Sequence, residues 1–186
     1  ESHVAQRLVE RVLAGATVVV VSDAGMPLVS DPGYRLLTAA IAADAPIEVL
    51  PGPSAALAAL ALSGLPTDRF AFEGFPPRKE GEKASALAAL AAEQRTLIFF
   101  ESPHRVRATL HAMAEAFGPD RQASVSREIT KRYEQTRRGP LTELAAWAAV
   151  EELRGEIAIV VAGRPAQAPT LDQLVAGALT RVGEGE

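Results

Sequence analysis

The sequence contains no cysteine and few aromatic residues, and these absences narrow what it can be. Among 186 residues there are 0 cysteines, and aromatic residues make up 5%. Without thiols the chain forms no disulfide and no thiolate metal site, which is consistent with a reducing, cytoplasmic location. No apolar run approaches the roughly 20 residues that a membrane-spanning helix needs. We therefore expect a cytoplasmic protein that does not enter a membrane and has no metal centre.

Two further absences concern ligand binding. The chain carries neither Gly-x-Gly-x-x-Gly nor Gly-x-x-x-x-Gly-Lys followed by Ser or Thr. It therefore has no standard dinucleotide fingerprint and no Walker phosphate loop. Its net charge of -4 argues against a broadly basic nucleic-acid binder, but not against a local basic patch. The sequence starts inside a helical pattern, so we expect an N-terminal piece to precede Glu1.

The most informative stretch is residues 17–33, TVVVVSDAGMPLVSDPG. Residues 17–21 are rich in β-branched side chains and predict a buried strand, which stops at the small turn 22–25. Residues 34–43 predict a helix, and residues 47–50 predict a second strand that ends in the turn 51–54. Ligands of open α/β sheets bind outside the carboxyl ends of strands. We therefore predict that these two turns form the floor of a ligand site.

The rest of the chain continues to alternate helices and strands. Its periodicity predicts helices at 4–13, 54–63, 83–93, 106–117 and 141–147, and strands at 70–72, 96–100, 123–125 and 156–162. Residues 171–179 predict one further weak helix. The interruption at 64–68 is a candidate domain boundary. We therefore predict an α/β fold with an N-terminal domain at 1–68, a C-terminal domain at 69–164 and a tail at 165–186.

Charged motifs follow two of the later strands. ESPHR at 101–105 has the composition of a helix start, with Ser102 as the cap and Pro103 at the first helical position. REITKR at 127–132, with two further arginines at 137–138, is the only basic concentration in the chain. Such a run is usually a solvated face. The alternative is contact with RNA phosphates, which a globally acidic protein has to concentrate locally.

Six blocks together resemble a known family. They are VSDAGMPLVSDPG at 21–33, LPGPSAA at 50–56, GLPTDRF at 64–70, EGFPP at 73–77, ESPHR at 101–105 and REITK at 127–131. In this order they resemble the ribosomal small-subunit RNA methyltransferase I group, a branch of the tetrapyrrole methylase superfamily. The resemblance covers residues 1–163.

This resemblance implies a fold, an activity and a cofactor. The fold is two α/β domains of the tetrapyrrole methylase type, with S-adenosylmethionine folded into the cleft between them, in a homodimer. The activity is 2′-O-methylation of a cytidine in the decoding region of 16S rRNA, with the 30S ribosomal subunit as partner. On the matching positions, the implied cofactor contacts are Asp23, Ala24, Gly25, Pro51, Gly52, Ser54, Ala55 and Phe100.

The sequence departs from the family pattern in three places. The family's opening strand and its Pro-Thr-Pro-Ile-Gly-Asn-Leu block find no match and would precede Glu1, so the first strand is missing. Met26 stands where Thr is usual. The C-terminal helical region is cut short. We therefore expect the cofactor cleft of this chain to lack part of its wall.

The predicted chemistry needs little beyond alignment. Methyl transfer from a sulfonium to a ribose hydroxyl is an in-line displacement without a metal, and a dry cleft supplies most of its catalysis. A general base helps, because the hydroxyl is a weak acid. The candidate bases are Glu101 and Glu128, with Lys131 as the alternative if burial lowers its pKa. The candidate RNA contacts are His104 as a positioner, Arg105 and Arg127 on the flanking phosphates, and Arg132, Arg78 and Lys79, with Lys83 as an extension of the same surface.

Two rival functions stay open. One is a methylase of tetrapyrrole precursors, which shares the fold, although the blocks at 101–105 and 127–131 argue against it. The other is a non-catalytic module that binds RNA or the ribosome and has lost cofactor binding together with the first strand.

Overall fold

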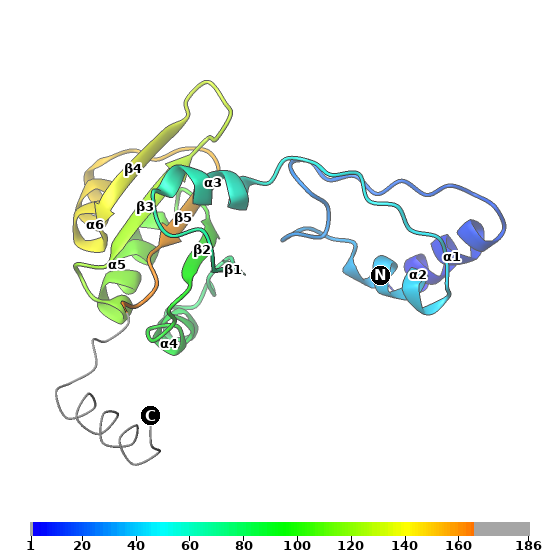
Figure 1. Cartoon of the computed structure of the whole chain (residues 1–186), viewed down its shortest axis with the longest axis horizontal. Coiled ribbons are helices and arrows are strands. Elements are labelled where there is room, and N and C mark those ends of the chain that lie inside the picture. Colours follow the sequence, from blue (N-terminus) through cyan, green and yellow to red (C-terminus); the bar gives the residue numbers. More distant parts are fainter. Residues whose placement is uncertain (1, 166–186) are drawn as a thin grey trace, which may run out of the picture.

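The computed structural model describes residues 2–165, and these form one sheet with helices on both of its faces. The elements in chain order are α1 (Ser2–Leu13), α2 (Tyr34–Ala42), α3 (Ala55–Ser63), β1 (Phe70–Gly74), α4 (Glu80–Ala89), β2 (Thr96–Glu101), α5 (Val106–Phe117), β3 (Gln122–Arg127), β4 (Gln135–Pro140), α6 (Leu141–Val150) and β5 (Ile157–Val161). Figure 1 shows α1 and α2 packed side by side at one end of the molecule and the strands at the other.

The strand directions bring several strand ends to one edge of the sheet. The strand order is β1-β2-β5-β3-β4, with β1 and β2 parallel and every other neighbouring pair antiparallel. Since β5 runs against both β2 and β3, the strands β1, β2 and β3 point the same way. Glu101 and Arg127 both pair with Ile157. The ends of β1, β2 and β3 and the start of β5 therefore share one edge, which we call the carboxyl edge.

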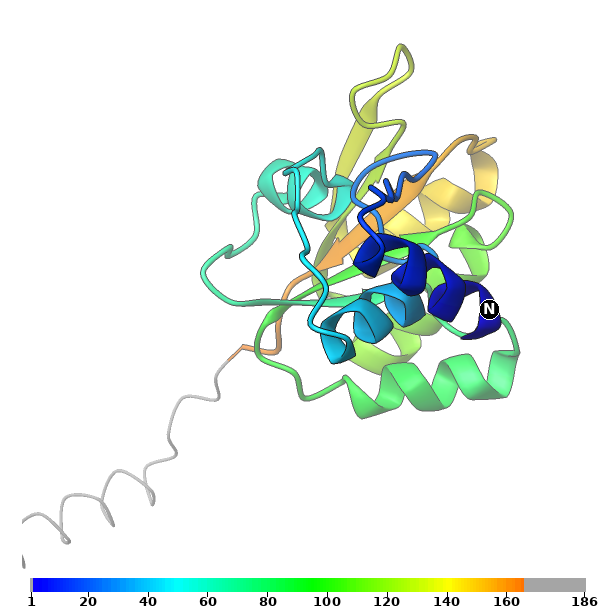
Figure 2. The same ribbon diagram turned by 90° about the vertical axis from the view of Figure 1, so that its right-hand side faces the viewer.

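Each face of the sheet buries its own core, because successive side chains of a strand point to opposite faces. Leu97 and Phe99 of β2 pack toward α4, α5 and α6, whereas Ile98 and Phe100 pack toward α3. Every residue of β5 is buried. Figure 2 views the molecule from the end that carries α1 and α2, so these two helices overlap the sheet in that view although Figure 1 shows them away from it. The central strands β2 and β5 are therefore the most deeply enclosed elements.

The helix α3 is capped at its start and tied to the sheet at its end. The Ser54 side chain accepts a hydrogen bond from the Leu57 amide, as the sequence predicts for a cap. At the other end Gly64 adopts a left-handed conformation with φ 73°. The guanidinium of Arg138 on β4 donates to the carbonyl of Leu62, with Nε at 2.8 Å. This contact positions the helix that covers the α3 face.

The predicted strands at 17–21 and 47–50 are wrong. Neither segment pairs with a strand in the part of the chain that the structure describes, and both run as extended coil. Their apolar side chains stay in solvent, as for Val19, Val21, Val49 and Leu50. β-branched residues favour a pleated, half-buried surface, but a strand also needs a hydrogen-bonded neighbour and a covering layer. In both segments the local strand propensity is high, but the hydrogen-bonded neighbour and the covering layer are missing from the described residues.

The four later strands are confirmed, and the structure adds β4. The sequence Gln-Thr-Arg-Arg-Gly-Pro of β4 lacks apolar alternation, because β4 lies at the edge of the sheet and pairs only with β3. α5 has the predicted bounds, whereas α4 begins at Glu80, three residues before the predicted start at 83. The α/β class is confirmed, and the domain boundary near residue 68 stays a prediction. The helix predicted at 171–179, like all of the tail beyond 165, lies outside the described residues.

The core facing α5 supplies a stability test. Leu110 is fully buried in this core, so Leu110→Ala removes its contacts and leaves a cavity. We expect the variant to lose about 2–5 kcal/mol of unfolding free energy in urea denaturation. Val150→Ala is the control, because Val150 is 86% exposed and should change stability by less than about 0.5 kcal/mol. Equal losses in the two variants would contradict this packing.

Candidate functional site

The two turns predicted to form a ligand floor lie against each other. The backbone amide of Gly52 donates a hydrogen bond to the Met26 sulfur at 3.1 Å. A Cβ added to Gly25, whose φ is +74°, would lie 3.4 Å from the Pro53 carbonyl oxygen. The Ser22 hydroxyl closes the first turn by donating to the Gly25 carbonyl at 2.9 Å. Residues that are 26 positions apart therefore form one small-residue surface.

Met26 itself joins the turns. Its sulfur accepts from Gly52 and would lie 3.3 Å from a Cβ added at that position. Met26 therefore occupies the space beside Gly52, so any larger residue at 52 would have to displace its side chain. The Met26 thioether is soft and adaptable, which suits it to the space between the two turns.

An aromatic cluster lies beside these turns at the carboxyl edge. The Phe100 ring contacts those of Phe72 and Phe75, with centroid separations of 4.9 and 5.7 Å. A Cβ added to Gly74 would lie 3.5 Å from the Ser30 hydroxyl, so the loop 22–33 reaches the end of β1. Phe100, the predicted apolar cofactor contact, lies on the α3 face, and its neighbour Phe75 follows the strand end that the loop 22–33 reaches.

Glu101 lies on the opposite face and is fully buried. Its side chain follows Leu97 and Phe99 along β2 and points toward α5. One carboxylate oxygen accepts from the Thr109 hydroxyl at 2.6 Å, and the other accepts from the Ser102 amide at 2.8 Å. With no exposed side-chain surface, it has no path to a substrate on the α3 face. This placement disfavours the predicted role of Glu101 as the general base and makes it a positioning residue.

Arg105 connects two loops, which leaves its side chain little freedom to bind phosphate. One terminal nitrogen donates to the carbonyls of Pro76 and Pro77 at 2.7 and 2.9 Å. The other lies 3.5 Å from a Glu101 carboxylate oxygen. The predicted role of Arg105 on a phosphate is therefore disfavoured, because its donors already hold the loop that follows β1.

The rest of the ESPHR block serves the turn before α5. The expected cap is wrong, because α5 begins at Val106 with Arg105 at the N-cap and no side-chain cap. Ser102 contributes its carbonyl instead, which accepts from the Arg105 and Val106 amides. His104 is exposed beside this turn, where a positioning role toward RNA stays a prediction.

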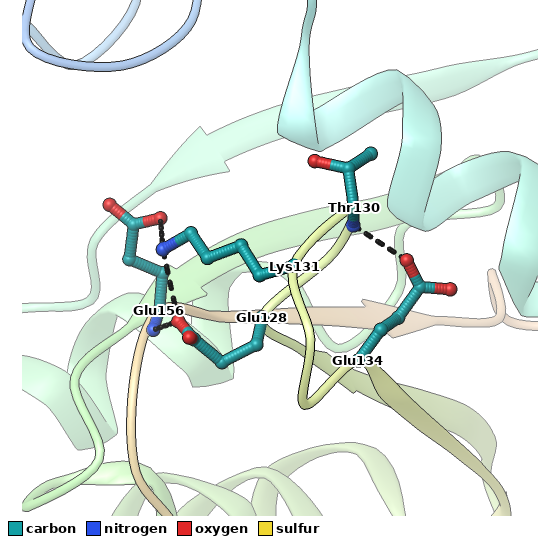
Figure 3. A network of polar contacts seen from close by, with 5 residues as sticks. All are labelled: Glu128, Thr130, Lys131, Glu134 and Glu156. Atoms are coloured by element: carbon teal, nitrogen blue, oxygen red, sulfur yellow. Dashed lines mark hydrogen bonds and ion pairs between the residues drawn. The ribbon is translucent and has the colours of Figure 1, made fainter.

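A lysine between two carboxylates closes the loop that follows β3, as Figure 3 shows. Lys131 Nζ lies 3.0 Å from Glu128 Oε1 and 2.8 Å from Glu156 Oε2. The Glu156 amide also donates to Glu128 Oε1 at 3.1 Å. Within the same loop the Thr130 amide donates to the Glu134 carboxylate. We call Glu128, Lys131 and Glu156 the latch, since they join the β3–β4 loop to the start of β5.

The latch maintains a loop with unusual backbone angles. Glu128 and Thr130 have positive φ angles of 50° and 67°, which cost energy for residues with a Cβ. A Cβ added to Gly155 would overlap the Glu128 side chain at 2.2 Å. Glycine at 155 therefore leaves the space into which Glu128 folds, and the surrounding contacts offset the backbone strain.

The electrostatics of the latch separate its two candidate bases. The hydrogen bond from Lys131 is the main cause that lowers the pKa of Glu128, followed by the Glu156 amide. Hydrogen bonds to Glu156 and Glu128 raise the pKa of Lys131. The condition for Lys131 as a base, a lowered pKa, is therefore not met. Glu128 is ionised at neutral pH. Its side chain is partly exposed, and only its Oε1 accepts the hydrogen bonds of the latch.

The predicted RNA contacts differ in how free their side chains are. Arg127 donates through Nε to the Gln135 side chain at 2.8 Å, and Arg132 lies over the Tyr133 ring. Arg78 is exposed, and Lys79 forms an exposed ion pair with Glu82 at 2.9 Å. Lys83 is buried, so it does not extend this surface.

The sequence did not reveal the contacts of three residues that shape the site. Glu156 directly precedes β5, and nothing in its local pattern shows that the loop after β3 reaches it. Arg138 holds α3 rather than a ligand. Phe75 belongs to the quoted EGFPP block, but only its contact with Phe100 shows where it lies.

Two kinds of site are absent from the described residues. Residues 2–165 contain no group of His, Asp and Glu side chains arranged to hold a metal ion. No helix in the same range has the length and apolar character to span a membrane.

The latch predicts a dependence of stability on pH. A group with a lowered pKa stabilises the fold fully above its ordinary value, here 4.5, and loses that contribution as pH falls through the lower folded value. We expect Lys131→Met to lower the urea midpoint at pH 7, and the gap to wild type to shrink on acidification below pH 4.5. Lys79→Met, which removes an exposed pair, should change the midpoint little. A gap independent of pH would contradict the latch.

The chain is similar to known methyltransferases in both sequence and fold. Residues 1–145 match the family model of the Tetrapyrrole (Corrin/Porphyrin) Methylases. A Mycobacterium tuberculosis protein named ribosomal RNA small subunit methyltransferase I is 53% identical over 156 residues, which is 84% of this chain and 54% of that relative. Relatives with the same name from Micromonospora olivasterospora and Pseudomonas aeruginosa are 48% and 43% identical, over 89% and 95% of this chain and 53% and 62% of their own lengths. The chain spans about half the length of the curated relatives it matches.

Solved structures of other methyltransferases share the fold. The methyltransferase CobJ aligns with a TM-score of 0.65 at 24% identity, over 90% of this chain and 73% of that one. Uroporphyrin-III C-methyl transferase from Thermus thermophilus, in a structure complexed with S-adenosylhomocysteine, aligns with a TM-score of 0.57 at 23% identity, over 86% and 72%. The family match over residues 1–145 and the relatives at 43–53% identity show that the chain belongs to the tetrapyrrole methylase family.

Proposed function

We propose that the protein containing this chain is an S-adenosylmethionine-dependent methyltransferase of small-subunit ribosomal RNA that methylates the 2′-hydroxyl of a cytidine. The observation that carries the proposal is the hydrogen bond between Gly52 and Met26, which holds the two glycine-containing turns against each other. The loops that follow β1, β2 and β3 lie together at the nearby carboxyl edge. Relatives at 43–53% identity carry an rRNA methyltransferase name. A homodimer and a cytoplasmic location are parts of the same proposal.

The residues of the two turns fit this cofactor. Gly25 and Gly52 lack side chains, so the two turns can lie against each other and present exposed backbone on which a ligand with an amino-acid moiety and an adenosine would rest. Phe100 supplies an apolar surface near them. When bound, S-adenosylmethionine supplies a methyl group already activated by a positive sulfur. The residues that would hold it are Asp23, Ala24, Gly25, Pro51, Gly52, Ser54, Ala55 and Phe100.

Glu128 is the side chain that we assign to the substrate proton. Its carboxylate is ionised, it lies at the carboxyl edge, and the latch orients it through Oε1 only. A positioned carboxylate oxygen accepts the proton of a hydroxyl as the new carbon–oxygen bond forms. Exposed cations at the same edge, among them Arg132 and Arg78, would bind the flanking phosphates and orient the ribose.

The cofactor site is tested by calorimetry with S-adenosylhomocysteine. We expect the intact protein to release heat on binding and Gly52→Val to weaken binding about tenfold or more, because the new side chain meets Met26. Gly81→Val is the matched control, since nothing lies within 4 Å of a Cβ at Gly81. Absence of binding by the intact protein would favour a non-catalytic module instead.

The catalytic assignment is tested by turnover with tritiated S-adenosylmethionine on 30S subunits. We expect Glu128→Gln to lower kcat about 10²- to 10⁴-fold while S-adenosylhomocysteine affinity stays unchanged. Glu101→Gln should instead lower the thermal midpoint, because its carboxylate is buried against Thr109. Unchanged kcat in Glu128→Gln would remove the proposed base.

The substrate is tested by two further assays. Mapping of 2′-O-methyl groups on 16S rRNA from cells lacking the gene should show one cytidine unmethylated. Turnover on uroporphyrinogen but not on 30S subunits would support the rival reading as a methylase of tetrapyrrole precursors.

A further inference from the structure

We propose that Phe75 is a stacking platform for an unpaired base of the RNA substrate, beside the site where the methyl group is transferred. The proposal rests on the proposed function and adds a residue that recognises the substrate. It follows from four features of the loop after β1: an exposed ring, a rigid support, adjacent cations and a place at the carboxyl edge.

The Phe75 ring is exposed although a cluster of aromatic rings lies next to it. Its relative exposure is 54%, while the ring contacts Phe100 at a centroid separation of 5.7 Å and an interplanar angle of 60°. Part of the ring is therefore held against the aromatic cluster and part of it is open to solvent. Bases of single-stranded RNA stack on aromatic side chains in this way, and the stacking tolerates any base.

The backbone under Phe75 is fixed by the following residues. The Arg105 guanidinium donates to the carbonyls of Pro76 and Pro77 at 2.7 and 2.9 Å, and it is itself paired with buried Glu101 at 3.5 Å. The two prolines also restrict the chain. A ring on a preorganised loop loses little conformational entropy on binding, which favours a recognition role.

Two cations follow Phe75 in the same loop, three and four residues later in the sequence. Arg78 is exposed and has no ion pair among the residues that the structure describes, and Lys79 is exposed with its amine near Glu82. An aromatic surface next to positive charge matches a base and its adjoining phosphate. An exposed phenyl ring by itself would not distinguish an RNA base from any other apolar ligand, whereas nearby cations favour a ligand with phosphates.

The position of Phe75 relates it to the proposed chemistry. It follows Gly74, which lies beside Ser30 of the loop 22–33, and that loop begins with the first of the two turns. Glu128 follows β3 at the same edge, three strand positions away in the order β1-β2-β5-β3, which is about 14 Å at roughly 4.8 Å per strand. A base on Phe75 and a ribose at Glu128 would therefore belong to nearby nucleotides of one strand.

Single-stranded RNA fits this platform better than duplex RNA. The bases of an A-form duplex are stacked inside the helix, so an isolated ring on a loop cannot reach their faces. An unpaired segment offers those faces together with its phosphates. The structure therefore assigns the ring to an unpaired nucleotide near the methylated one.

Fluorescence polarisation with a labelled single-stranded oligocytidylate of about ten nucleotides, within the span of known single-strand sites, tests the platform. We expect Phe75→Ala to weaken binding by the intact protein about 5- to 100-fold, and Phe75→Tyr to retain affinity. The slope of log affinity against log salt should be unchanged in Phe75→Ala but reduced by about 0.7 in Arg78→Gln, which removes one phosphate contact.

Phe70→Ala is the matched control, because Phe70 is the residue of the same type at the other end of β1 and should leave RNA affinity unchanged. Equal RNA binding by wild type and Phe75→Ala would overturn the platform alone. Loss of S-adenosylhomocysteine affinity in Phe75→Ala with normal RNA binding would place the ring in the cofactor wall and also overturn it. Absence of RNA binding by wild type would overturn the proposed RNA substrate, and the platform with it.

Discussion

Burial of β5 between β2 and β3 is the constraint on which the rest of the structure depends. All five of its residues are apolar and enclosed, and they contribute to the cores on both faces of the sheet. Because β5 runs against both neighbours, β2 and β3 point the same way and deliver their following loops to one edge. Those loops hold nearly all of the charged candidates of the site. The buried centre of the sheet thus determines that the polar candidate residues lie together at the carboxyl edge.

Two polar connections then hold the loops at that edge. Arg105 links the loops after β1 and β2, with buried Glu101 behind it. The latch links the loop after β3 to the start of β5. The free energy of such partly buried pairs is small relative to the apolar core, so their main effect is on geometry. They place Phe75 and Glu128 at the carboxyl edge with limited freedom, which a recognition or proton-accepting role requires.

Sequence reasoning succeeded where a pattern acts locally. The strands at 70–72, 96–100, 123–125 and 156–162 are apolar and bounded by turn residues, and all four are confirmed. It failed at 17–21, where β-branched residues lack a neighbouring strand within the described residues. It also failed at β4, whose polar edge-strand sequence carries no alternation. In both cases the outcome depends on a partner that no local window contains.

For the candidate site, too, local features could be predicted from the sequence and long-range contacts could not. The small-residue turns at 22–25 and 51–54 and the charged blocks at 101–105 and 127–131 could be identified from sequence, because their residue types are special. Whether a carboxylate faces a core or a substrate depends on strand parity and packing, so only the tertiary structure separates buried Glu101 from Glu128. The same holds for Lys131, whose pKa is raised first by its hydrogen bond to Glu156, a residue that lies 25 positions away and directly precedes β5. The sequence by itself determined which chemical groups are present and near which strand ends. The tertiary structure decided which of them meet, because contacts between residues far apart in the chain arise only from the packing of the sheet.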